Sequence, residues 1–213
     1  MINSENRNPM TDFINIFLPP DKISLKVGLF FGSFNPVHIG HMAIANYITE
    51  FAGLKQVWFV VSPQNPFKKR EDLLNDIDRY EMVLKAIGDD PRFRVTDIEF
   101  RMPKPSYTID TLKQLTGKYP NHNFSLIVGS DILESFTRWK EYQSILDNFP
   151  VLVYPRPGAV PASFTHPCIR TLDAPLIEIS STFLRNAIRE GRNMRCFFPE
   201  KVWEYLDKMN FYR

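Results

Sequence analysis

The protein has 213 residues, 44% of them hydrophobic, and a formal net charge of +2. This length suits one well-packed domain, and no block of like charge is long enough to indicate a tail that binds nucleic acid or a membrane surface. The two cysteines, Cys168 and Cys196, are too few and too far apart for a disulfide framework or a zinc site, which favours a reduced, cytoplasmic protein.

The chain shows no targeting or membrane-spanning pattern. No apolar run approaches the roughly 18 residues that a membrane-spanning helix needs. Residues 1–25 lack the basic start and long apolar core of a secretory signal, so we expect them to be an N-terminal extension. Residues 26–213 are then expected to form a single domain. The sequence leaves its oligomeric state open, and a homo-oligomer is one alternative.

In chain order, apolar strands alternate with amphipathic helices. Strands are predicted at residues 26–31, 56–62, 93–100, 124–131, 151–156 and 176–180. Helices are predicted at residues 41–53, 75–88, 106–119, 139–146, 181–191 and 200–209. Because the strands are apolar on both faces, they favour an α/β fold with a parallel sheet covered by helices on both sides. Ligands of such sheets bind at the carboxyl ends of the strands, near the point where the strand order reverses.

The most unusual segment joins the first strand to the first helix and reads Gly32-Ser33-Phe34-Asn35-Pro36-Val37-His38-Ile39-Gly40-His41. Gly32 lets the chain turn sharply and lets a ligand approach the main chain. The first N–H groups of the helix attract anions, and each histidine can donate a hydrogen bond to phosphate. One histidine near a helix start often only caps or packs. Two of the chain's four histidines at such a place favour a phosphate clamp.

A second candidate phosphate site lies at residues 179–185, where a predicted strand gives way to a helix. The hydroxyls of Ser180, Ser181 and Thr182 and the first N–H groups of the helix can surround a phosphate oxygen. Arg185 lies one helical turn further on and supplies a fixed positive charge. An ordinary N-cap beside a surface arginine explains the same pattern equally well.

Two more strand ends carry candidate ligand-binding residues. The basic run Lys68-Lys69-Arg70 follows the second strand. Such a run is usually a solvated surface, but its place at the carboxyl end of a strand favours Lys68 as a ligand-binding residue. Gly129 and Asp131 follow another buried strand, where an acidic side chain can bind a ribose hydroxyl.

Two further features can each bind part of a ligand. Trp139 can stack on an aromatic ring, although packing in the core explains a tryptophan on a helix at least as well. The segment from Pro105 to Thr108 offers main-chain amides at the start of a helix, which can hold a carboxylate or simply form a helix cap.

Together these motifs resemble a known family of enzymes. The segment "GSFNPVHIGH" is similar to the His-x-Gly-His signature of nucleotidyltransferases, and "ISSTFLR" is similar to their second phosphate-binding signature. The segments "SPQNPFK", "PSYTIDTL" and "VGSDIL", with Trp139, resemble those of the bacterial nicotinate-nucleotide adenylyltransferases. The resemblance implies a Rossmann-like fold. It also implies a magnesium-dependent reaction of ATP with nicotinate mononucleotide, which gives deamido-NAD and pyrophosphate in NAD biosynthesis.

The resemblance also implies a role for each candidate residue. Catalysis would fall to His38, His41 and Arg185. ATP and its phosphates would be bound by Gly32, Ser33, Phe34, Gly40, Lys68, Gly129, Asp131, Ser180, Ser181 and Thr182. The nicotinate nucleotide would be bound by Thr108 and Trp139. No protein residue is assigned to Mg²⁺, which would be bound through the ATP phosphates.

Two positions depart from the family pattern. Asn35 stands where the usual pattern has Asp, so it can keep a hydrogen-bonding role in the loop but cannot be a charged metal ligand. Phe67 stands where the loop after the second strand often has His. Because Phe67 cannot donate a hydrogen bond to phosphate, Lys68 is the better candidate in that loop.

Three other functions stay open on the sequence alone. The same chemistry can act on nicotinamide mononucleotide or phosphopantetheine, against which Thr108 and Trp139 favour nicotinate. A protein that binds nucleotides without turning them over is supported only by Asn35. A fragment related to aminoacyl-tRNA synthetases, which also carry a His-Ile-Gly-His box, is disfavoured by the modest net charge and the lack of their lysine-rich second signature.

Overall fold

The computed structural model describes residues 24–63, 73–158 and 164–213. The predicted extension at residues 1–25 lies almost entirely outside the described residues, so its boundary with a domain at 26–213 stays a prediction. Phe67 and Lys68 also lie outside the described residues.

In the described part of the chain, six strands form one parallel sheet. The strands are β1 (Leu25–Gly32), β2 (Gln56–Val61), β3 (Phe93–Thr96), β4 (His122–Gly129), β5 (Val151–Tyr154) and β6 (Ile169–Thr171). Their order is β3-β2-β1-β4-β5-β6, and every neighbouring pair is parallel. The predicted α/β, Rossmann-like class is therefore confirmed. The order reverses between β1 and β4, which is where such sheets bind ligands.

The helices follow from this strand order. They are α1 (Ile39–Phe51), α2 (Asp76–Ile87), α3 (Thr108–Lys118), α4 (Tyr142–Asn148), α5 (Ser181–Arg189) and α6 (Glu200–Lys208), with 3₁₀ helices η3 (Ile98–Arg101), η4 (Ser130–Arg138) and η5 (Arg195–Phe197). Helices α1 and α2 link strands that step one way across the sheet, whereas α3 and α4 link strands that step the other way. Because parallel crossovers are right-handed, the two pairs cover opposite faces.

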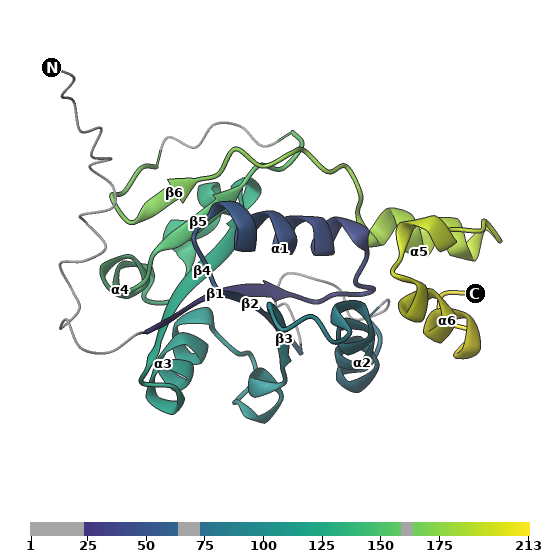
Figure 1. The fold of residues 1–213 in the computed structure, drawn as a ribbon, viewed down its shortest axis with the longest axis horizontal. Coiled ribbons are helices and arrows are strands. Elements are labelled where there is room, and N and C mark those ends of the chain that lie inside the picture. Colours follow the sequence, from purple (N-terminus) through teal and green to yellow (C-terminus); the bar gives the residue numbers. More distant parts are fainter. Residues whose placement is uncertain (1–23, 64–72, 159–163) are drawn as a thin grey trace, which may run out of the picture.

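The core has one layer on each face of the sheet. Phe59 of β2 packs in the layer formed with α1 and α2, and its neighbour Trp58 packs in the layer formed with α3 and α4. Burial on both faces explains why the strands read as continuous apolar runs. Helices α5 and α6 lie beyond the carboxyl end of β1, at the right of Figure 1.

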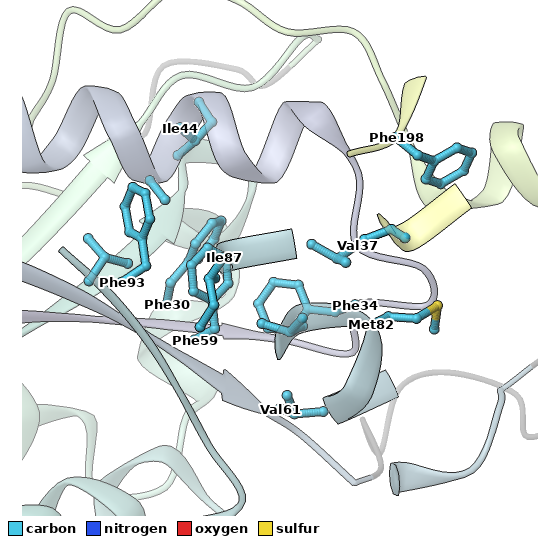
Figure 2. Packing of buried hydrophobic residues seen from close by; sticks show 14 of the residues in the cluster. Phe30, Phe34, Val37, Ile44, Phe59, Val61, Met82, Ile87, Phe93 and Phe198 are labelled. Atoms are coloured by element: carbon cyan, nitrogen blue, oxygen red, sulfur yellow. The ribbon is translucent and has the colours of Figure 1, made fainter. Parts of the chain in front are cut away.

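Part of the loop after β1 belongs to the core. The side chains of Phe34 and Val37 are buried, and Figure 2 shows them among Phe30, Phe59 and Met82. The Phe34 ring meets Phe30 and Phe59 edge-on, at centroid distances of 5.7 and 5.4 Å. This packing anchors the loop that carries the two histidines.

Some predicted elements differ from the structure. The prediction of a strand at 176–180 is wrong, because these residues form no ladder and run as an extended segment into α5. The last strand is instead β6, a short element that the sequence analysis did not predict. The predicted strand 93–100 ends at Thr96 and continues as η3, and the helix predicted at 139–146 begins only at Tyr142.

Candidate functional site

The candidate site is a pocket at the switch point of the sheet. It is lined by Phe30, His38, Gly40, His41, Ile44, Tyr154, Pro155, Arg156, Ile177 and Ile179. The start of α1 supplies the histidines, the end of β5 supplies the arginine, and the segment before α5 supplies the two isoleucines. The structure thus places the predicted His38-Ile39-Gly40-His41 box where doubly wound sheets bind ligands.

The two histidines cap α1 through their Nδ1 atoms. The Gly40 N–H donates to Nδ1 of His38, and the His38 N–H donates to Nδ1 of His41, each at 3.2 Å. Because Nδ1 accepts in both rings, the proton of each neutral imidazole is on Nε2. The rings lie 3.8 Å apart, centroid to centroid. The capping role of these histidines is therefore observed, and because capping uses Nδ1, a phosphate clamp through Nε2–H stays a prediction.

His38 is neutral near pH 7. Its side chain is buried, and burial, followed by the positive charge of Arg156, lowers the pKa of His38 from 6.5 to about 3. It can therefore donate a hydrogen bond to an anion without carrying charge itself. Gly40 leaves room for this ring, because a Cβ there would lie 3.0 Å from it.

Buried hydrogen bonds hold the loop that precedes the histidines. Oδ1 of Asn35 accepts from the Leu74 N–H at 3.2 Å and from the Tyr212 hydroxyl at 2.7 Å. These bonds support the structural role that the sequence analysis left open for this asparagine. The carbonyl oxygen of Gly32, at the end of β1, accepts from the Ser62 N–H at 2.9 Å.

Arg79 of α2 is the strongest anchor of this loop. Its side chain is fully buried, and it donates to the carbonyl oxygens of Ser33, Ser62 and Pro63 at 2.7, 2.8 and 3.1 Å. It also pairs with Asp76 at 2.6 Å. One guanidinium thus ties the loop after β1 to the end of β2. The sequence analysis missed Arg79, because a charged residue on an amphipathic helix reads as part of its exposed face.

The predicted second phosphate signature lies against the same loop. Ser180 is the N-cap of α5, and its Oγ accepts from the Phe183 N–H at 3.2 Å. The Ser181 hydroxyl donates to the Pro36 carbonyl oxygen at 2.9 Å. Nη1 of Arg185 donates to the Asn35 carbonyl oxygen at 2.9 Å. Its Nη2 donates to the exposed Thr182 hydroxyl at 3.4 Å. The N-terminus of α5 is therefore fastened to the loop after β1.

The end of β4 lies beside an arginine that the sequence analysis missed. Nε of Arg156 lies 3.9 Å from Oδ1 of Asp131, and a Cβ on Gly129 would approach its Cγ to 2.8 Å. Gly129 is therefore required for this close approach. Arg156 is the last residue of the strand predicted at 151–156, so the rule that singled out Lys68 was a usable signal for it as well.

The segments of Thr108 and Trp139 lie together, but neither residue lines the pocket of the histidines. Lys140 joins them: its Nζ binds Asp110 at 2.8 Å and lies 4.9 Å from the centre of the Tyr107 ring. Trp139 is half-buried and packs on Phe136 at a centroid distance of 5.1 Å. The N-terminus of α3 has no side-chain cap, so its first N–H groups can receive an anion.

Within residues 24–63, 73–158 and 164–213, no three His, Cys, Asp or Glu side chains gather as metal ligands. Asp131 lies 3.9 Å from the pocket residue Arg156, and the buried Asn35 already accepts two hydrogen bonds. This donor set fits a cation that is held mainly by phosphate oxygens and water, as Mg²⁺ usually is. No helix in the described ranges is both long and apolar enough to cross a membrane.

Comparison with known proteins first defines the class: residues 29–187 match the family described as cytidylyltransferase-like. A Flavobacterium johnsoniae protein named a probable nicotinate-nucleotide adenylyltransferase is 50% identical over 192 residues, which cover 89% of this chain and 100% of that protein. A Bacteroides fragilis protein of the same name is 50% identical over 85% of this chain and 90% of its own. The chain therefore belongs to the nicotinate-nucleotide adenylyltransferase family, and the resemblance seen in the sequence is confirmed.

A solved structure supports the fold independently. Plasmodium falciparum nicotinic acid mononucleotide adenylyltransferase, complexed with NaAD, aligns with a TM-score of 0.73 at 18% identity. The alignment covers 88% of this chain and 97% of that one. The Rossmann-like architecture is thus shared across a wide sequence distance.

Proposed function

We infer that the protein transfers the adenylyl group of ATP to nicotinate mononucleotide, which releases pyrophosphate and forms deamido-NAD. The observation that carries this function is the pair of Nε2–H donors, His38 and His41, beside Arg156 at the switch point of the sheet. The curated relatives at 50% identity support the same acceptor and reaction through their names.

The reaction needs alignment and charge stabilisation more than a base. The second pKa of a phosphate monoester is about 6, so the acceptor's 5′-phosphate is largely dianionic near pH 7. One of its oxygens forms a bond to the α-phosphorus of ATP, and the bond from that phosphorus to the bridging oxygen of pyrophosphate breaks. His38 and His41 would donate to phosphate oxygens on this path, where fixed donors stabilise the developing charge.

The other predicted residues would complete the ATP site. The start of α5, with Ser180, Ser181, Thr182 and Arg185, would hold the outer phosphates. The backbone of Gly32, Ser33 and Phe34 would face the nucleotide, since the Phe34 side chain is occupied in the core. Mg²⁺, bound through the phosphates, would neutralise charge on the leaving pyrophosphate. The roles of four further residues at this site stay predictions: Gly40, Gly129, Asp131 and Lys68. A cytoplasmic location also stays a prediction.

Thr108 and Trp139 would bind the pyridine ring. Support comes from the start of α3, which has no side-chain cap and suits a carboxylate. It also comes from the half-buried Trp139, because its neighbour Lys140 pairs with Asp110 in the first turn of α3. A flat aromatic residue beside an anion site matches a ring that carries a carboxylate.

Pyrophosphate release tests the function. We would supply ATP and Mg²⁺ with nicotinate mononucleotide, nicotinamide mononucleotide or phosphopantetheine in parallel. A strong preference for nicotinate mononucleotide is expected. Preference for another acceptor would retain the phosphate machinery but contradict the roles of Thr108 and Trp139. No release with any acceptor, from a protein that still binds ATP, would contradict the enzymatic function.

A further inference from the structure

A buried carboxylate lies behind the segment that leads into α3. Glu99 of η3 is only 3% exposed. Its Oε1 accepts from the Thr111 hydroxyl at 2.7 Å, and its Oε2 accepts from the Ser106 hydroxyl at 3.0 Å. The Ser62 hydroxyl also lies close enough to favour the charged form of this carboxylate. A buried acid costs free energy unless it is hydrogen-bonded, and the bonds from Thr111 and Ser106 offset that cost.

The three hydroxyls come from different parts of the site. Thr111 lies in the first turns of α3, Ser106 lies two residues before Thr108, and Ser62 follows β2. The N–H of Ser62 donates to the carbonyl oxygen of Gly32, at the end of β1. Glu99 is therefore bonded to the start of α3 and lies close to Ser62, whose main chain supports the end of β1.

Glu99 is poorly placed to act as a base. Both oxygens are engaged by protein hydroxyls, and the residue does not line the pocket of the histidines. Burial raises the pKa of Glu99, and the three hydroxyls oppose that effect. The carboxylate holds the Ser106 hydroxyl, two residues before Thr108.

We propose that Glu99 is a positioning residue for the acceptor: it fixes the Ser106–Thr108 segment so that the start of α3 can bind the carboxylate of the pyridine nucleotide. This inference rests on the proposed function, since it takes Thr108 as part of the pyridine pocket. It predicts that loss of a Glu99 contact weakens binding of nicotinate mononucleotide and leaves ATP binding intact.

The test uses four single variants of the full chain. Glu99→Gln removes the charge and keeps the shape, while Ser106→Ala and Thr111→Val each remove one donor. Thr49→Val is the matched control, because Thr49 is also a buried helical threonine, but its hydroxyl donates to the Asn46 carbonyl oxygen within α1. Steady-state kinetics with both substrates, and a melting curve, are measured for each variant.

The expected result is a KM for nicotinate mononucleotide raised about threefold to tenfold in the three Glu99-network variants, the range for one lost hydrogen bond. The KM for ATP should stay within about twofold, and Thr49→Val should change neither KM. Lower melting temperatures with both KM values unchanged, or an equal rise in both, would overturn the proposal. If Glu99→Gln does not fold, the half-buried Ser106→Ala decides by the same criterion.

The design separates this proposal from the proposed function. Wild-type turnover with nicotinate mononucleotide tests the function, whereas the ratio of variant to wild-type KM tests Glu99. A wild-type enzyme that uses only another acceptor would contradict the proposed function. For that acceptor, a raised KM ratio would still assign Glu99 to positioning the acceptor, without the carboxylate contact, and an unchanged ratio would overturn its role.

Discussion

The two sides of the site are held in place by different means. On the phosphate side, the loop after β1 is bonded by the fully buried Arg79, by the buried Tyr212 and by Arg185. On the pyridine side, the start of α3 is linked to residues 139–141 by ion pairs of Lys140 and Lys113, whose side chains are 42% and 54% exposed. Exposed pairs contribute little, so Glu99 is the main buried anchor there.

This difference matches what each side has to do. Stabilising charge in a transition state requires donors that are fixed before the reaction, which buried hydrogen bonds provide. Binding a flat ring requires a surface and an anion site, which tolerate small adjustments. The structure therefore predicts that changes on the phosphate side affect stability and kcat, and that changes on the pyridine side affect the KM of one substrate.

The largest expected effect is on stability. Arg79→Met should lower the free energy of unfolding by about 3–5 kcal/mol, because it leaves Asp76 and several carbonyl oxygens without their buried partner. Lys113→Met on the pyridine side, which breaks the exposed pair with Glu141, should cost at most about 1 kcal/mol. Urea unfolding of both variants measures the contrast, and similar losses would contradict the comparison.

The next effect is on turnover. His41→Ala should lower kcat by about 100-fold to 1,000-fold, the effect of deleting one preorganised donor worth about 2.7–4 kcal/mol. Pyrophosphate release measures kcat, and a melting curve shows whether the protein is folded. A folded variant with near wild-type turnover would remove His41 from the catalytic machinery.

A smaller effect concerns the dependence of stability on pH. The unfolded state protonates His38 below its ordinary pKa of 6.5, whereas the folded state stays neutral down to about 3, so stability is lost as pH falls through this range. Between pH 7 and pH 5 the loss from His38 is about 2 kcal/mol. In His38→Gln, the amide oxygen can still cap α1. Its free energy of unfolding should fall by about 2 kcal/mol less than that of the wild type over the same pH change. The free energy of unfolding at both pH values tests this, and equal losses in both proteins would contradict it.

The smallest effect belongs to the pyridine side. Trp139→Ala should raise the KM for nicotinate mononucleotide about threefold to tenfold, the range for one aromatic contact, with a smaller change for ATP. Trp203→Ala is the control, since Trp203 is also partly buried but packs on Phe198, away from the pocket. Equal rises for both substrates would mean that Trp139 only packs in the core.

Local sequence patterns were sufficient to predict much of the fold and part of the site. The buried strands and the His38-Gly40-His41 box could be predicted because short apolar runs and a helix start depend on neighbouring residues. The strand at 176–180 was wrong, because alternation in "LIEIS" cannot reveal whether a partner strand is available. Ile177 and Ile179 instead line the pocket.

Long-range contacts explain what the sequence could not provide. Arg79 and Glu99 look like ordinary surface charges in their segments. Only the folded chain brings Arg79 to the distant Ser33 carbonyl oxygen and buries Glu99 against the Thr111 hydroxyl of the next helix. The same holds for Tyr212, which reaches Asn35 across most of the chain. These hydrogen bonds join residues that no local sequence pattern connects.

The most direct test of adenylyl transfer follows the α-phosphate of ATP. With ATP labelled at that phosphorus, nicotinate mononucleotide and Mg²⁺, we expect the label to enter a dinucleotide product, with one pyrophosphate released for each label transferred. Label that stays in ADP, or in AMP formed without a dinucleotide, would contradict adenylyl transfer at this site.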